Sequence, residues 1–198
     1  MAEDILAPVS LVGEHARLEC LDASHAEGLK AAVGNLWQLR VTVVPPPDGV
    51  AAEIERRLGL RDKGTMLPFT VFDAAGEIVG MTTFMNIDPV NRRVEIGSTW
   101  YAERVQRTPL NTNCKLLLLT HAFETLECIA VEFRTHRLNT PSRRAIERLG
   151  AQLDGMLRAH SRSADGTLRD TAVYSVTAAE WPTIKSHLQW QLEKPRNY

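Results

Sequence analysis

One strand–helix–strand segment constrains the fold more than any other part of the sequence. A strand pattern at 94–101 (VEIGSTWY) leads to a helix pattern at 112–126, and a second strand pattern follows at 129–135 (IAVEFRT). The helix repeats apolar side chains at three- and four-residue steps: Cys114, Leu117, Leu118, Ala122 and Leu126. The second strand places three apolar side chains on one face: Ile129, Val131 and Phe133. A helical crossover of this kind makes its two strands parallel.

The segments on either side add hairpins and further helices. Strand patterns occur at 16–21, at 68–73 and 78–87 around a Gly76 turn, and at 152–162 and 168–177 around Asp165-Gly166. Helical spacing occurs at 23–33, 50–62, after Pro141, and in the tail at 178–198. The sequence therefore predicts a single α+β domain. Its sheet is mixed, mostly antiparallel and of about seven strands, with flanking helices.

Several residues are expected to mark helix ends. Polar side chains that accept from free amides suit the position before a helix. The residues placed there are Asp22, Asp48, Asn111, Thr112 and Thr140. Pro141 suits a helix start and Gly150 suits the position after a helix end.

Composition excludes several classes of protein. The chain has 198 residues, 44% of them hydrophobic, and a formal net charge of −1. That balance predicts a globular protein, with no nucleic-acid partner because no basic surface is indicated. No apolar run is long enough for a membrane span, and the acidic start lacks a signal-peptide pattern, so we expect a cytoplasmic protein without a membrane partner. Three widely spaced cysteines predict reduced thiols, and the six histidines show no metal-ligand spacing, so no metal is expected.

The junction at 101–113 (YAERVQRTPLNTN) is the segment best suited to bind an anion. It leads into the strongest helix, whose first amides are free and whose dipole is positive at that end. Arg104 and Arg107 add two cationic side chains that can reach a pyrophosphate. Most helix starts bind only water. These residues alone therefore do not decide between a specific anion site and an ordinary hydrated helix start.

At this junction the sequence resembles the GNAT superfamily of N-acetyltransferases, in the branch of the Rim-type ribosomal-protein N-terminal acetyltransferases. The resemblance covers residues 9–182 and leaves 183–198 as a C-terminal helical extension. The family's pyrophosphate loop is Q/R-x-x-G-x-G/A. Arg104 matches its first position, whereas Arg107 and Pro109 stand where the family has glycines. Glycine there allows a positive φ and close approach to phosphate, and Pro109 removes one amide donor.

Three other segments carry the same resemblance. The stretch 94–100 (VEIGSTW) resembles the family strand that splays from its neighbour to admit acetyl-CoA. The stretch 139–150 (NTPSRRAIERLG) resembles the N-x-x-S/A signature that follows the next strand, and 165–174 (DGTLRDTAVY) resembles the final hairpin. The resemblance therefore implies a GNAT-like fold with a splayed strand pair, and acetyl-CoA as the acyl donor.

The resemblance also implies which residues contact the donor. Backbone amides of the splayed strand polarise the thioester carbonyl, the loop and helix start hold the pyrophosphate, and Asn139 bonds the pantetheine arm. The residues so assigned are Thr99, Trp100, Tyr101, Arg104, Arg107, Thr108, Leu110, Asn111, Thr112, Asn139 and Ser142. For Asn139 the alternative is capping of the next helix, and both roles are compatible.

Three side chains are candidates for proton transfer. Glu95 lies on the strand where the superfamily often has a carboxylate, and His160 has a pKa range suited to the same task. Ser142 is the candidate that protonates the leaving thiolate. Each has a structural alternative: a solvated strand glutamate, a surface histidine, and a serine bonded to backbone. The acceptor pocket is expected to include Trp37, Asn86 and Asp88.

These observations favour an acetyl-CoA-dependent N-acetyltransferase that acts on a primary amine, either of a small molecule or of a peptide N-terminus. The resemblance implies that transfer proceeds by direct attack in a ternary complex. An enzyme that uses another acyl-CoA fits the same residues. Because of Arg107 and Pro109, a non-catalytic binding or regulatory protein of the same fold is the alternative. The tail, with Trp181 and Trp190, is a candidate for a homodimer contact.

Overall fold

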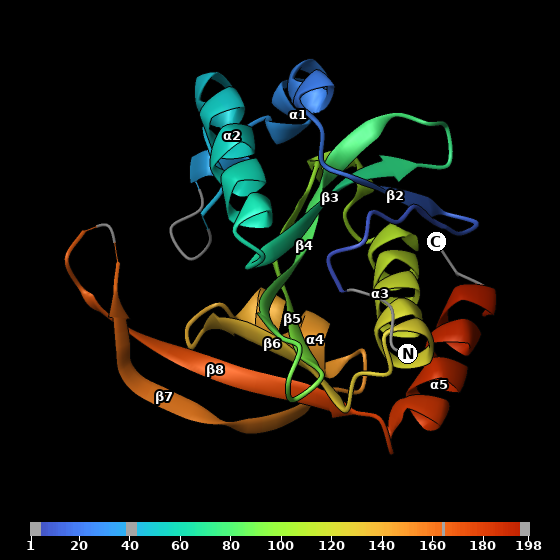
Figure 1. Cartoon of the computed structure of the whole chain (residues 1–198). Helices are drawn as coiled ribbons and strands as arrows, with labels where there is room; N and C mark the ends of the chain where they lie inside the picture. The colour runs from blue at the N-terminus through green and yellow to red at the C-terminus, as the bar shows by residue number, and fades with distance from the viewer. Residues whose placement is uncertain (1–4, 39–42, 164, 195–198) are drawn as a thin grey trace.

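The computed structural model describes residues 5–38, 43–163 and 165–194. A single sheet of eight strands runs through it in the order β1-β2-β3-β4-β5-β6-β8-β7 (Figure 1). The strands are β1 Leu11–Val12, β2 Ala16–Cys20, β3 Met66–Asp73, β4 Ile78–Asp88, β5 Arg93–Tyr101, β6 Ala130–His136, β7 Gln152–Arg162 and β8 Leu168–Thr177. β5 and β6 are parallel, and the other neighbouring pairs of this sheet are antiparallel.

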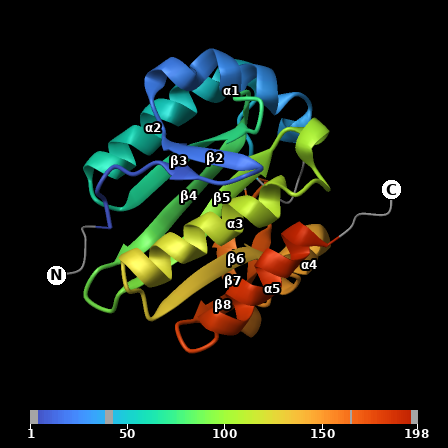
Figure 2. The same ribbon diagram turned by 90° about the vertical axis from the view of Figure 1, so that its right-hand side faces the viewer.

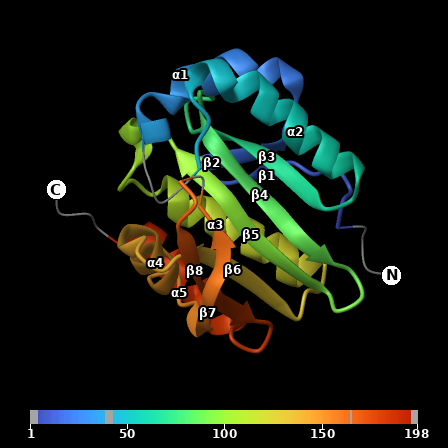
Figure 3. The same ribbon diagram turned by 90° about the vertical axis from the view of Figure 1, so that its left-hand side faces the viewer.

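Helices cover both faces of the sheet. They are α1 Ala26–Val33, α2 Val50–Asp62, α3 Leu110–Thr120, α4 Thr140–Glu147 and α5 Trp181–Glu193, with short 3₁₀ turns at Ala23–His25, Leu36–Gln38, Pro47–Gly49 and Glu103–Val105. Figure 2 shows α3 and α5 in front of the sheet, and Figure 3 shows α1 and α2 across its first strands. A π-helical turn, His121–Thr125, ends α3.

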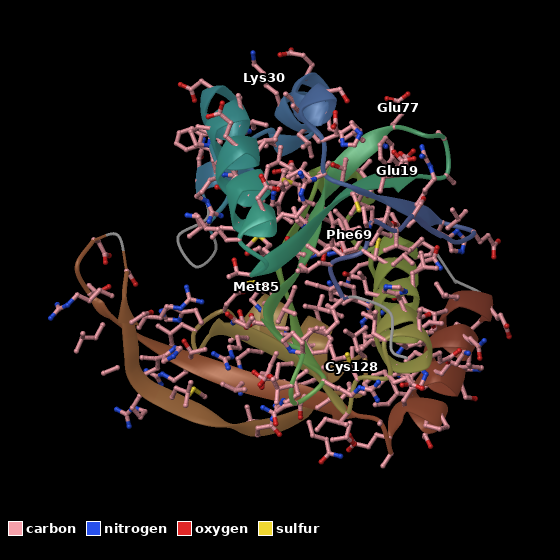
Figure 4. The ribbon with its side chains drawn as sticks, viewed as in Figure 1. Glu19, Lys30, Phe69, Glu77, Met85 and Cys128 are labelled. Atoms are coloured by element: carbon pink, nitrogen blue, oxygen red, sulfur yellow. The ribbon has the colours of Figure 1, made fainter. Side chains whose placement is uncertain are left out.

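The sheet's apolar side chains divide into two buried clusters. The larger lies against α3 and α5 and includes Phe69, Phe84, Leu118, Val131 and Leu188. The smaller lies beneath α1 and α2 and includes Leu29, Ile54, Met81 and Trp100. Burial of this much apolar surface on both faces stabilises a single domain. Figure 4 shows Phe69 inside this layered body, with Lys30, Glu77 and Glu19 at its outer parts.

The predicted α+β fold and its parallel crossover are confirmed. The seven expected strands are present, and the short β1 pairs with β2 as an eighth. One residue was misplaced: Ile129 precedes β6 and is exposed, so it does not share the buried face of Val131 and Phe133.

The predicted helix ends are only partly correct. Asp22 does cap, since its carboxylate accepts from the Ser24 amide at 2.9 Å. The prediction is wrong at Asp48, because α2 begins after Gly49 without a side-chain cap. It is also wrong at Thr140, because Asn139 takes the capping position of α4 and its side chain accepts from the Ser142 amide. At the start of α4 two adjacent residues were suitable caps, Asn139 and Thr140, and the backbone geometry selected Asn139.

Helix α5 starts at Trp181 and runs without interruption to Glu193, through the boundary expected at 183; residues 195–198 of that tail lie outside the described residues. Its Leu188 is buried in the larger cluster, and its Trp181 stacks on Phe123 and donates to Glu124 at 2.8 Å. Trp190 is exposed. The first part of the tail is therefore integral to the core.

Gly80 on β4 provides a test of how tightly β4 and β5 pack. A Cβ there would lie 2.2 Å from the Trp100 carbonyl oxygen, which belongs to backbone and cannot move aside. We expect Gly80→Ala to lower the free energy of unfolding by about 2 kcal/mol or more in urea denaturation. Gly59→Ala is the matched control. Apart from the backbone of its own helix, its Cβ would meet no described atom within 4 Å, and better helix propensity should raise stability by about 0.5–1 kcal/mol. Equal effects at both positions would contradict the packing argument.

Candidate active site

The parallel pairing of β5 with β6 stops after three residue pairs. Arg93 faces Ala130, Val94 faces Val131, and Glu95 faces Glu132. Beyond this last pair, β5 continues to Tyr101 and β6 continues to His136 without a ladder between them. The splayed strand pair expected from the sequence is therefore present. It leaves backbone groups of both strands free for another partner.

A bulge in β5 accompanies the splay. The β4–β5 register shifts between Met81 and Thr83, and Ser98 has a φ of 48°, which is strained for a residue with a side chain. Arg57 of α2 is almost fully buried and donates to the Thr83 hydroxyl at 2.8 Å and to the Ser98 carbonyl at 3.4 Å. The bulge is therefore fixed to α2 through a buried guanidinium group.

Thr99, Trp100 and Tyr101 follow Ser98 on β5, and their side chains contact different parts of the protein. The Thr99 hydroxyl lies 2.8 Å from that of Thr82, and Trp100 packs in the cluster beneath α1 and α2. The Trp100 indole N–H is buried and has no hydrogen-bond partner within the described ranges. Tyr101 faces the Cys114 thiol of α3, and burial raises the pKa of both groups, that of Cys114 to about 12. All three residues lie beyond the last β5–β6 pair.

Lys115 of α3 is a buried ammonium group beneath the same segment. It donates to the Thr99 hydroxyl at 3.2 Å. Burial lowers its pKa to about 8, because desolvation disfavours the charged form and no carboxylate of the described residues compensates it.

The loop between β5 and α3 has an unusual backbone. Arg107 has a φ of 62°, a left-handed conformation, at the position where the family loop carries its first glycine. The Thr108 hydroxyl donates to the Val105 carbonyl at 2.7 Å, and Pro109 occupies the position before α3. Arg104 is in an ion pair with Asp73 at 2.7 Å and is more than half exposed.

Helix α3 starts two residues earlier than the sequence pattern indicated. Its first residue is Leu110, and the Asn113 amide donates to the Pro109 carbonyl at 3.0 Å. The expected capping role of Asn111 and Thr112 is therefore wrong. Both lie in the first turn, and the buried Thr112 hydroxyl accepts from Arg148, the residue that follows α4. The amides of Asn111 and Thr112 precede the first intrahelical bond, so they remain available to an anion.

Asn139 and Ser142 lie at the start of α4. The Asn139 side-chain oxygen accepts from the Ser142 amide at 3.2 Å, which is the capping alternative weighed for Asn139. No hydrogen bond to the Ser142 hydroxyl is found in the described part of the chain, and the side chain is half-buried. On the nearby strand β8, the Tyr174 phenol donates to Glu147 at 2.7 Å and accepts from Arg143.

Glu95 lines a cavity of about 470 Å³ on the face opposite α3. It is 5% exposed, accepts from the Asn86 amide at 2.6 Å, and lies 3.5 Å from the Arg134 guanidinium. Burial raises the pKa of the Glu95 carboxyl, and this effect outweighs the hydrogen bond from Asn86 and the charge of Arg134. A carboxyl with a raised pKa beside a cavity is suited to accept a proton near neutral pH.

The other predicted site residues are distributed unevenly around this cavity. Asn86 and Asp88 line it; Asp88 accepts from Asn91, which lowers the Asp88 pKa. Trp37 is exposed in the 3₁₀ turn that precedes residues 39–42, which lie outside the described residues. His160 is exposed on β7, 3.1 Å from the Thr171 hydroxyl, and is absent from the cavity lining within the described ranges.

Sequence reasoning missed several polar residues of this site. Glu132 and Arg134 line the cavity from β6, and Arg57 and Lys115 hold the bulge of β5 from opposite faces. The alternation of β6 was a usable signal, since Glu132 and Arg134 flank the buried Phe133 and must share the opposite face. For Arg57 and Lys115 the helical pattern gave no signal that a charged residue would be buried.

Comparison with known proteins places this geometry in a family. Residues 16–152 match the model of the acetyltransferase (GNAT) domain. The chain belongs to the GNAT acetyltransferase family. A GCN5-related N-acetyltransferase from Brucella melitensis superimposes with a TM-score of 0.85 at 35% identity, over 96% of this chain and 88% of that one.

Two further relatives of this GNAT protein are informative. A Bacillus subtilis (strain 168) protein named ribosomal N-acetyltransferase YdaF is 34% identical over 106 residues, which span 54% of this chain and only 57% of YdaF. Mycobacterium smegmatis RimJ, solved in complex with CoA-disulfide, has a TM-score of 0.79 at 21% identity, over 94% of this chain and 96% of that one. At that identity the likeness to RimJ concerns the fold.

The described residues lack two further features. They contain no helix long and apolar enough to cross a membrane. They also contain no group of three or more His, Cys, Asp or Glu residues placed to hold a metal ion.

The left-handed backbone at Arg107 predicts a stability gain from glycine. A side chain in this conformation costs about 1–2 kcal/mol, and glycine removes that cost but has a more mobile unfolded state. We expect Arg107→Gly to raise the free energy of unfolding by about 0.5–1 kcal/mol in urea denaturation. Arg107→Ala, which keeps the strained Cβ, should change it little. A gain of the same size for alanine would instead point to the lost charge.

Lys115 predicts a pH-dependent stability. Its pKa is about 8 in the folded GNAT domain and near 10.5 when unfolded. The unfolded state therefore binds more protons between these values, and stability rises as the pH increases from about 8 to about 10.5. We expect a rise of about 2–3 kcal/mol for the wild type relative to Lys115→Met, measured by urea denaturation at several pH values. Parallel curves for the two proteins would contradict the buried charge.

Proposed function

We propose that this GNAT protein transfers an acetyl group from acetyl-CoA to a primary amine, with a protein N-terminus as the preferred acceptor. The observation that carries the proposal is the end of the β5–β6 ladder at Glu95. At this point the two strands separate, which leaves room for a donor, and the buried Glu95 carboxyl also lines the cavity proposed for the acceptor. Donor and acceptor can thus approach the same point from opposite faces of the sheet.

The donor side fits acetyl-CoA in three respects. Free amides of Asn111 and Thr112 at the start of α3 suit a pyrophosphate. The left-handed Arg107 gives the preceding loop the backbone shape that glycine usually supplies. Thr99, Trp100 and Tyr101 lie on the splayed part of β5, where backbone amides can bond the pantetheine arm and polarise the thioester carbonyl.

The chemistry needs a free amine and a protonated leaving group. In the proposed step Glu95 takes a proton from the acceptor ammonium, and the amine nitrogen attacks the thioester carbonyl. The C–N bond forms as the C–S bond breaks. The attacking nitrogen then loses its second proton, and the thiolate gains one; the Ser142 hydroxyl is the relay we favour, because it gives a proton to the thiolate and regains one from the nitrogen. Glu95 is preferred to His160 as base because it lines the cavity and His160 is on an exposed outer strand.

A peptide N-terminus is preferred as acceptor for two reasons. Three carboxylates (Asp88, Glu95 and Glu132) and two arginines (Arg93 and Arg134) line the cavity, a balance that favours a cationic ammonium group. YdaF carries the name of a ribosomal N-acetyltransferase. A small-molecule amine is the alternative acceptor of the same site.

We infer a cytoplasmic location from the similarity to YdaF, which carries the name of a ribosomal N-acetyltransferase. Homodimer formation is a further proposal. It is supported by the edge strand β7, whose Leu153 and Leu157 are exposed, and by Trp190 on α5.

A non-catalytic GNAT-fold binding protein is the second candidate function. Pro109 removes an amide from the anion site, and the Arg104 side chain is engaged by Asp73. Titration calorimetry with acetyl-CoA, followed by mass spectrometry of a peptide with a free N-terminus, separates the two. We expect saturable binding and a peptide heavier by one acetyl group. No heat at about 1 mM acetyl-CoA would exclude the transferase.

The role of Glu95 is tested by Glu95→Gln. The amide keeps the shape of the side chain but cannot take a proton, so we expect turnover to fall by about 100-fold or more. The dissociation constant for acetyl-CoA should change less than about twofold, because the donor binds on the other side of the sheet. Glu55→Gln, on the exposed face of α2, is the control and should keep the wild-type rate. An unchanged rate for Glu95→Gln would assign the proton transfer to another group.

A further inference from the structure

The last pair of the β5–β6 ladder places two carboxylates side by side. Glu95 and Glu132 are register partners on neighbouring parallel strands, and both line the cavity. Strands in a sheet are about 4.8 Å apart, so the two side chains are close neighbours on one face. Glu95 is the base of the proposed function, whereas Glu132 takes no part in the proposed proton transfer.

The two carboxylates have unequal partners. Glu132 is held from both sides: Arg93 contacts one oxygen, and Arg134 donates to the other at 2.8 and 3.0 Å. Glu95 has the neutral amide of Asn86 at 2.6 Å and shares Arg134 only at 3.5 Å. The Glu95 side chain is 6% exposed and that of Glu132 is 16% exposed. Glu95 is thus more deeply buried and less compensated by cations.

Like charges at this separation disfavour ionisation of both groups together, and the proton goes to the less compensated member. The other charged groups of the cavity do not reverse this order. Asp88 is engaged with Asn91, and Arg93 is engaged with Glu132. With Glu132 and Arg134, these are the charged groups that line the cavity in the described part of the chain.

We propose that Glu132 and Arg134 are positioning residues that act on Glu95 in opposite directions. Glu132 raises the proton affinity of Glu95, and Arg134 limits that rise. Glu132 is held by the two guanidinium groups, and Glu95 is the member of the pair that receives the proton from the acceptor ammonium. The last step rests on the proposed function, whereas the electrostatic coupling does not.

The coupling is tested without any activity measurement. Protein labelled with ¹³C at the glutamate side chains is titrated by NMR, and the Glu95 signal is assigned by its loss in Glu95→Gln. We expect Glu132→Gln to lower the Glu95 pKa by about 0.5–1 unit, because a like charge is removed and Arg134 is released toward Glu95. We expect Arg134→Met to raise it by a similar amount. Arg134→Lys, which keeps the positive charge, should restore most of the wild-type value.

Glu127→Gln is the matched control, since Glu127 is an exposed glutamate paired with Arg92 near the same end of the strands. It should leave the Glu95 titration unchanged. Shifts in the same direction for the Glu132 and Arg134 variants, or shifts no larger than that of the control, would overturn the proposal. If Glu132→Gln fails to fold, the raised Glu95 pKa in Arg134→Met and its return to the wild-type value in Arg134→Lys still decide it.

Activity then separates this proposal from the proposed function. With an active transferase, the acidic limb of the kcat/KM profile should move to lower pH in Glu132→Gln and to higher pH in Arg134→Met, by the shifts seen in NMR. NMR shifts as expected in a protein without transferase activity would reject the function and keep the coupling. An unmoved acidic limb in an active enzyme would reject the role of the pair in proton transfer.

Discussion

The short parallel ladder between β5 and β6 is the constraint on which the rest of this structure depends. Three residue pairs hold the two halves of the sheet together, and the strands then separate. A longer ladder would close the sheet and remove the place where a donor can enter. A shorter one would weaken the only parallel junction in the described sheet, across which the larger apolar cluster is continuous. The candidate site thus lies where the hydrogen-bonded pairing of β5 and β6 ends within the sheet.

Two buried cationic side chains hold the bulged, splayed part of β5 in place, and burying one of them costs folding free energy. Arg57 bonds the strained bulge of β5 from the α2 face, and Lys115 bonds Thr99 from the α3 face. Arg57 is compensated by Glu53 at 2.7 Å, whereas the hydrogen-bond partner of Lys115 among the described residues is the Thr99 hydroxyl. Burying a poorly compensated ammonium group opposes folding. Lys115 lies beneath the splayed segment of β5. A site of this kind keeps the backbone shape that its function needs even where this lowers the stability of the fold.

Much of the fold was predictable from local patterns. The crossover, both hairpins and the span of the final strands follow from periodicity and turn residues such as Gly76 and Gly166. Cap residues were predicted less well, because Asn139 and Thr140 are both suitable and only the backbone angles decide between them. Of the site, Glu95 and Asn86 were named from sequence, and their contact at 2.6 Å emerged only when β4 and β5 were paired.

The sequence by itself determined the order of the elements and the family, because hydrophobic periodicity and short motifs are local properties of the chain. The tertiary structure decided which charged residues act together. Glu95 and Glu132 are 37 positions apart and meet only through the strand register, and Arg57 and Lys115 are buried only because both faces of β5 are covered. Proton affinity depends on burial and on the distance to other charges, and both quantities exist only in the folded chain.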